Sequence, residues 1–110
     1  MDRIPETDWE YLRKIQDELL EKLSKRINDK VREALADTAA SEYERRGNVN
    51  GLVHDWDKVV AECFNGWSRS NAVWSLLALR HWGLLTDDPL RNLTEETQRI
   101  VGKAVVKTEL

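Results

Sequence analysis

The chain has 110 residues, of which 41% are hydrophobic and 34% are charged, a composition typical of one folded domain and not of a disordered segment. It contains 17 Lys and Arg against 20 Asp and Glu, and the net charge of −3 argues against a surface that tracks phosphates over the whole protein. The single cysteine excludes an intramolecular disulfide and a cysteine-rich metal site. The N-terminus has no apolar signal core and no run of about 18 apolar residues occurs, so we expect a cytoplasmic protein without a membrane partner.

The first predicted element is a long amphipathic helix over residues 8–46. Its apolar positions recur in steps of three and four, the helical period. They include Trp9, Leu12, Leu19, Leu23, Ile27 and Val31. Such a helix would be ~55 Å long at 1.5 Å per residue, whereas a compact domain of this size is roughly 30–35 Å across. Its far end must therefore meet a second helix, a partner chain or a break near Asp37 and Thr38.

A second copy of the chain is the simplest cover for the surplus apolar face of this helix. We therefore predict a homodimer whose interface contains the six apolar residues named above. Light scattering at micromolar concentration would test that assembly.

The remaining predicted elements are shorter helices. Gly47 and Gly51 are expected to break the first helix, and a second helix follows over residues 52–64 and stops at Asn65–Gly66. A third helix, capped by Ser68 or Ser70 and ended by Gly83, is apolar nearly all round and should be the buried centre. Thr86 begins a short turn and Thr94 caps a last helix. The sequence thus predicts one all-α domain over residues 1–110, with a long helical region at 8–66 and a small helical head at 68–110.

No catalytic or metal-binding pattern is visible in the sequence. His54 and His81 are the only histidines, and the adjacent side chains of His54 and Asp55 point in different directions on a helix. Cys63 lies on an apolar stripe, where a thiolate is disfavoured. No nucleophile elbow and no phosphate-binding glycine loop occurs. We therefore expect neither an enzyme nor a bound cofactor or metal.

Five tryptophans are the main candidates for binding another protein. Trp56, Trp67 and Trp74 are predicted in the core. Trp9 and Trp82, near the chain start and a helix end, are predicted on a partner surface. Trp67 also stands two residues before Arg69, and an aromatic anchor beside a cation is common at protein interfaces.

Two other functions remain as alternatives. Residues 76–105 have the spacing of a helix-turn-helix DNA-binding module, although Glu95 and Glu96 at the start of its last helix would repel phosphate. Nucleic acid is therefore a disfavoured partner. A small-molecule-binding helical protein would instead need a deep pocket lined by Trp56, Trp67 and Trp74.

The second half of the chain resembles the C-terminal head of the fluorescence recovery protein and its bacterial relatives. The resemblance spans about residues 65–98 and consists of Arg69-Ser70, an apolar helix, Gly83-Leu84-Leu85 and Leu93. It implies an all-helical homodimer that binds another protein, which in that family is the orange carotenoid protein.

The resemblance adds one pair of residues to the predicted partner-binding set. The family's functional surface has a Trp, an adjacent His-Asp pair and a following Arg. His54-Asp55 resembles the pair, while Gly51 and Val60 stand at the Trp and Arg positions, so we expect the same scaffold with another partner. The predicted partner-binding residues are His54, Asp55, Trp67, Arg69 and Trp82. The leading prediction is a non-enzymatic protein-binding regulatory module.

Overall fold

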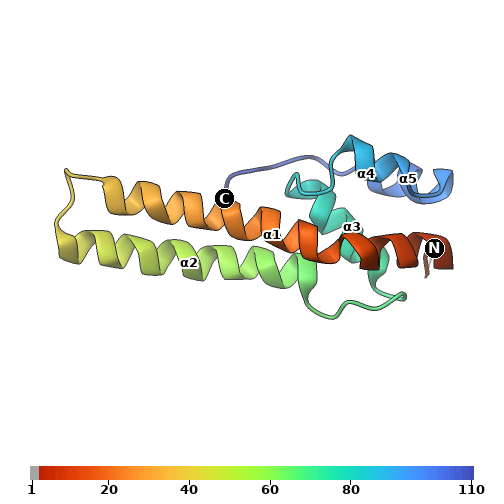
Figure 1. Ribbon diagram of the computed structural model, residues 1–110, viewed down its shortest axis with the longest axis horizontal. Helices are drawn as coiled ribbons and strands as arrows, with labels where there is room; N and C mark the ends of the chain where they lie inside the picture. The colour runs from red at the N-terminus through yellow and green to blue at the C-terminus, as the bar shows by residue number, and fades with distance from the viewer. Residues whose placement is uncertain (1–2) are drawn as a thin grey trace.

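The computed structural model describes residues 3–110, and in that part of the chain all regular structure is helical. The helices are α1 (Glu6–Ala36), α2 (Glu42–Phe64), α3 (Ala72–His81), α4 (Asp87–Arg91) and α5 (Glu95–Val101). Figure 1 shows α1 and α2 as an antiparallel hairpin, with the shorter helices gathered around one end of it. The predicted all-α fold, with a long first helix packed on a second and a helical head, is confirmed.

The molecule is elongated because the hairpin extends well beyond the head. Its extents are 51 × 24 × 21 Å and its Cα radius of gyration is 16.2 Å, against ~13 Å for a compact chain of this length. No helix among residues 3–110 is both long enough and apolar enough to cross a membrane.

The first helix ends ten residues earlier than the sequence pattern predicts. Residues 37–41 reverse the direction of the chain, and Ser41 and Glu44 form a capping box at the start of α2. Ser41 Oγ accepts from Glu44 N at 3.1 Å, and Glu44 Oε1 accepts from Ser41 N at 3.2 Å. Arg45 Nε donates to the Asp37 carbonyl at 2.7 Å and ties the turn to the new helix. The break near Asp37, one of the alternatives considered, is thus the outcome, and the uninterrupted helix to residue 46 is wrong.

Gly47 and Gly51 do not break a helix, contrary to prediction. Both lie inside α2, which starts at Glu42 instead of Leu52. The capping box fixes the start of α2, and packing along α1 outweighs the ~1 kcal/mol by which each glycine disfavours a helix relative to alanine. Asn65–Gly66 and Gly83 do end helices as predicted, and both glycines have positive φ, of 67° and 70°.

The core runs through the head and along the inner faces of α1 and α2. Its buried hydrophobic residues are Ile4, Leu12, Leu19, Leu23, Trp56, Val59, Cys63, Ala72, Leu76, Leu79, Trp82, Leu84, Leu85, Leu90, Leu93 and Val101. Leu12, Leu19 and Leu23 are at most 2% exposed within one chain. Their predicted place at a contact between two copies is therefore wrong, because α2 and the head already cover them.

Asp8 joins the start of the chain to the head. Its carboxylate is 2% exposed and accepts from Thr94 N at 2.8 Å, Thr94 Oγ1 at 2.7 Å and Thr97 Oγ1 at 2.6 Å. The sequence suggests Asp8 as an acid at the start of its own helix. In the structure Asp8 keeps that place in the first turn of α1, and its carboxylate also accepts from the N–H of Thr94, the residue that precedes α5, near the positive end of that helix dipole.

Candidate functional site

The predicted partner-binding residues do not form one surface. His54 and Asp55 are exposed in the middle of α2. Trp67 is half-buried, donates from Nε1 to the Cys63 carbonyl at 2.6 Å, and stacks on Phe64 at 5.8 Å between ring centroids. Arg69 donates from Nε to the Ile4 carbonyl at 2.9 Å and thereby fastens the chain start to the loop before α3.

Two tryptophans have the opposite burial to the one predicted. Trp82, predicted on the partner surface, is 6% exposed; it packs against Trp56 at 5.7 Å between centroids and donates from Nε1 to Glu62 at 3.0 Å. Trp74, predicted in the core, is 72% exposed. The reason is that α3 is apolar nearly all round in sequence but buries only the side that carries Ala72, Leu76 and Leu79.

The three tryptophans proposed to line a small-molecule pocket are therefore apart. Trp56 packs on Trp82, Trp67 contacts Phe64 and Trp9, and Trp74 faces solvent. They line no common cavity, so this arrangement gives no support to the small-molecule alternative.

The ionisable and nucleophilic side chains are also dispersed. Among residues 3–110, no group of three or more His, Cys, Asp or Glu side chains is placed to hold a metal ion. Burial raises the pKa of the Cys63 thiol to about 12, so the thiolate needed for nucleophilic chemistry is scarce at neutral pH. A hydrogen bond from Arg80 lowers the pKa of Asp87, which acts as an ion-pair partner at the start of α4.

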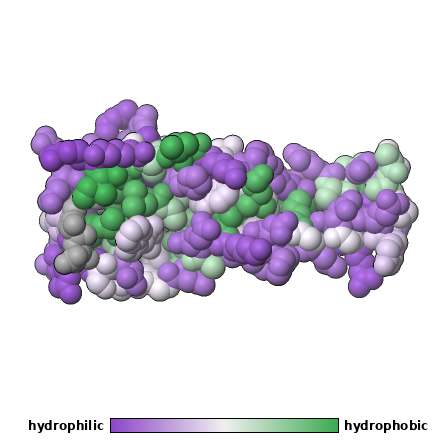
Figure 2. Space-filling view, turned by 180° about the vertical axis from the view of Figure 1, so that it is seen from behind, coloured by the Kyte–Doolittle hydropathy of each residue, from purple (hydrophilic) through white to green (hydrophobic). Residues whose placement is uncertain are grey.

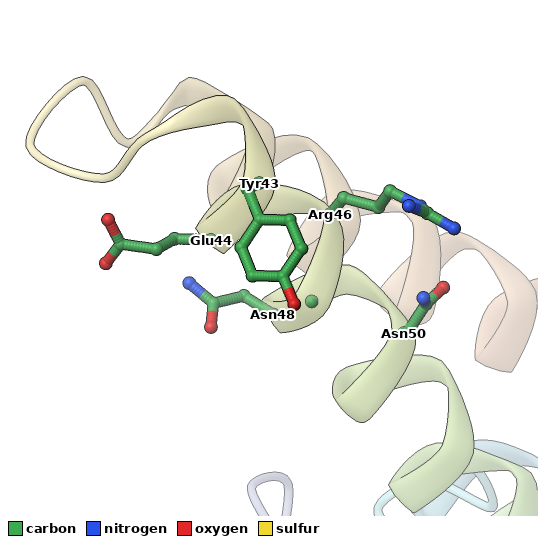
Figure 3. Close-up of a pocket in the computed structure, with 6 residues that line it drawn as sticks. Tyr43, Glu44, Arg46, Asn48 and Asn50 are labelled. Carbon is green, nitrogen blue, oxygen red and sulfur yellow. The ribbon is translucent and has the colours of Figure 1, made fainter.

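A shallow hollow lies near the hairpin tip, on the outer side of α2. It has a volume of about 410 Å³ and is lined by Tyr43, Glu44, Arg46, Gly47, Asn48 and Asn50. Figure 3 shows Glu44 and Asn48 pointing away from Arg46 and Asn50, with the Tyr43 ring between the two pairs. Because these polar groups diverge, they offer no convergent set of donors or acceptors for a small substrate.

A stripe of hydrophobic side chains lies along one side of the α1–α2 hairpin, and we name it the hairpin flank. It consists of Leu20, Ile27 and Val31 of α1 and Val53, Val60 and Phe64 of α2. At about 100° per residue, the α1 members lie about 80–120° around the helix from buried Leu19, and the α2 members lie about 40–80° from buried Trp56, in the same rotational sense. Because the two helices are antiparallel, both sets fall on the same side of the hairpin.

Contacts at the head end show which side this is. Trp9 and Phe64 meet through Trp67 on the side of the hairpin flank, at 6.2 and 5.8 Å between centroids. Tyr11 and Glu62 point the other way and bond to Asn92 and Trp82 of the head, at 2.9 and 3.0 Å. The head therefore covers the opposite side. The head leaves the hairpin flank partly open: Leu20 and Val53 are 39% and 37% exposed, whereas Ile27, Val60 and Phe64 are partly buried against the core.

The remaining surface is mostly hydrophilic. On the face seen in Figure 2, hydrophobic side chains gather over the head end and become sparse along the hairpin, where hydrophilic side chains dominate. The observed features are an uncovered apolar flank and one exposed tryptophan, and both are features of protein-binding surfaces.

The fold and these surfaces define the chain as a helical hairpin with a small helical head. No family model, no curated protein and no solved structure matches it. The resemblance to the fluorescence recovery protein family therefore rests on the residue pattern described above and stays a prediction.

Proposed function

We propose that this protein is a non-enzymatic protein-binding regulatory module that works as a homodimer. The observation that carries the proposal is the hairpin flank, an apolar stripe on the side of α1 and α2 that the head leaves uncovered. Two of the residues predicted for the dimer interface, Ile27 and Val31, belong to it. The dimer thus uses the edge of the first helix, and not its inner face.

A second copy suits the hairpin flank because the stripe is long, narrow and hydrophobic, with five aliphatic side chains and Phe64. Such a stripe can pack against an antiparallel or crossing copy of itself across a twofold axis, so that the same hydrophobic patch of each copy covers the other. The pairing would leave Trp74 of each chain free for the regulated partner, since Trp74 lies on α3 in the head. Tryptophan is among the residues that contribute most to binding energy at interfaces.

The test is the molar mass in solution, measured by light scattering across the micromolar range. Val53→Glu is expected to shift the mass to that of one chain, because it places a charge inside the proposed contact. Asn48→Glu is the matched control, since it adds the same charge to the same helix about 140° away, and it should leave the mass at that of two chains. A wild-type protein with the mass of one chain throughout that range would contradict the homodimer.

The regulatory half of the proposal needs its own measurement. Trp74→Ala should abolish binding to the native partner isolated by tagged pull-down, while the molar mass and the helical circular dichroism stay unchanged. Unchanged binding by Trp74→Ala would remove this residue from the partner surface.

A further inference from the structure

The C-terminal segment 105–110, which we name the strap, returns over the molecule after α5. Figure 1 shows it leaving the head and running back to end beside the middle of α1. The Lys107 N–H donates to the His81 carbonyl at 2.5 Å, and His81 Nδ1 lies 2.5 Å from the Val105 carbonyl, to which the ring donates. Near the end of the strap, Glu109 pairs with Lys30 of α1 at 2.5 Å.

The strap covers the aromatic end of the core. Lys107 Nζ stands over the Trp82 ring, 5.7 Å from its centroid. A Cβ at Gly83 would come within 3.3 Å of Thr108 Cγ2, so the strap lies directly on the glycine that ends α3. The strap thus engages three features of the surface beneath it: the His81 carbonyl, the face of Trp82 and the ammonium group of Lys30.

The strap is held by few contacts. It uses one backbone hydrogen bond, one histidine hydrogen bond, one cation–π contact and one ion pair whose carboxylate side is 71% exposed. Its apolar side chains contribute little, because Val105, Val106 and Leu110 are 78%, 53% and 54% exposed. Ordering six residues opposes these contacts, and the ion pair joins a largely covered Lys30, 20% exposed, to a Glu109 carboxylate that solvent still screens.

We propose that the strap is displaceable and that the site beneath it docks an extended segment of a partner protein. The strap itself defines the chemistry of that segment: a cation that stacks on Trp82, with its backbone N–H on the His81 carbonyl, followed two residues later by a carboxylate that pairs with Lys30. This inference rests on the proposed function only in taking the partner to be a protein, and a chain that proves monomeric leaves it intact.

Charge reversal tests whether the strap opens. Amide hydrogen exchange of the full chain, read at Lys107, should be at least ~100-fold faster than at the core residue Leu19. Glu109→Lys should accelerate exchange at Lys107 about threefold or more through repulsion by Lys30, and Lys30→Glu/Glu109→Lys should restore the wild-type rate. Glu96→Lys, the same change at an exposed site on α5, should have no effect. Protection of Lys107 equal to that of Leu19 would overturn a displaceable strap.

A matched pair of opened variants tests the docking site. A fluorescein-labelled synthetic peptide of residues 104–110 is titrated into Glu109→Lys, which keeps Lys30, and into Lys30→Glu, which opens the strap but removes the cation. We expect binding at least fivefold tighter to Glu109→Lys, and no binding of a scrambled peptide by either variant. Equal affinity for the two variants, or no binding, would overturn the site.

A second copy of the chain is the other occupant to test. Carbodiimide treatment of a mixture of isotopically light and heavy chains should join Lys30 to Glu109 only within one chain, as read by mass spectrometry. Mixed light–heavy Lys30–Glu109 links would assign the strap to exchange between copies and overturn docking of a separate partner.

Discussion

Asp8 offers the sharpest test of how the chain start and the head depend on each other. The carboxylate is 2% exposed and accepts three hydrogen bonds from Thr94 and Thr97 at 2.6–2.8 Å. Asp8→Ala would leave an N–H at the start of α5 and two hydroxyl groups without this acceptor in a place that water cannot easily reach. The two hydroxyls, 3.2 Å apart, can bond to each other, which recovers part of the loss.

The expected loss of unfolding free energy follows from these contacts. A hydrogen bond to a charged group contributes ~1.5–3 kcal/mol, and loss of a helix cap alone costs ~0.5–2 kcal/mol. Because the three bonds share one acceptor and the hydroxyls can re-pair, their losses do not add. We expect Asp8→Ala to destabilise the fold by about 2–4 kcal/mol, which lowers the thermal midpoint by about 10–20 °C in a chain of this size.

The measurement is urea unfolding followed by far-ultraviolet circular dichroism at one fixed protein concentration. Asp17→Ala is the control, since Asp17 is exposed on the same helix, and it should change stability by less than ~0.5 kcal/mol. A double-mutant cycle with Thr97→Val should give a coupling of at least ~1 kcal/mol. The reasoning would be refuted if Asp8→Ala matched Asp17→Ala, because Asp8 would then contribute no more than a surface acid.

Two further predictions concern backbone and thiol. Gly47→Ala should stabilise the protein by about 0.5–1 kcal/mol, because a Cβ there meets nothing within 4 Å and alanine favours the helix. Gly83→Ala, at φ +70°, should instead destabilise it by about 1–2 kcal/mol. Urea unfolding measures both changes, and equal effects would mean that the segment around Gly47 is not helical. The Cys63 thiol, whose pKa burial raises from 9.0 to about 12, should react with a disulfide reagent at pH 8 only as fast as the protein opens. Because the folded state holds this proton more tightly than the unfolded state, the stability that the proton confers is complete below pH 9 and is lost as the pH rises from 9 through 12. Cys63→Ala should therefore lose less unfolding free energy than the wild type between pH 8 and 10.5. An equal loss in the two proteins would contradict the raised pKa.

The turn between α1 and α2 shows what sequence reasoning could have found. The apolar period continues weakly through Thr38, Ala39 and Tyr43, and that continuity favours an unbroken helix. Ser41-x-x-Glu44 is the sequence signature of a helix start, and the structure uses it. A local capping signal therefore decides the break where the periodic signal is weak.

The tryptophans show what local pattern could not decide. Trp74 and Trp82 lie on one apolar segment, and nothing in that segment says which side meets α2. Trp82 is buried because Trp56 and Glu62 of α2 and Lys107 near the end of the chain converge on it from two distant parts of the sequence. The same holds for the acceptor role of Asp8, whose donors lie 86 and 89 residues away.

The sequence by itself determined the helical class, the helix ends at Gly66 and Gly83, and the division into a long helical region followed by a small helical head. These depend on periodicity and on glycine conformations, which act between near neighbours. Only the tertiary structure decided which apolar side chains are interior, which flank of the hairpin stays uncovered, and where the chain end lies. Those outcomes depend on the packing of segments far apart in the chain, and no local pattern contains that information.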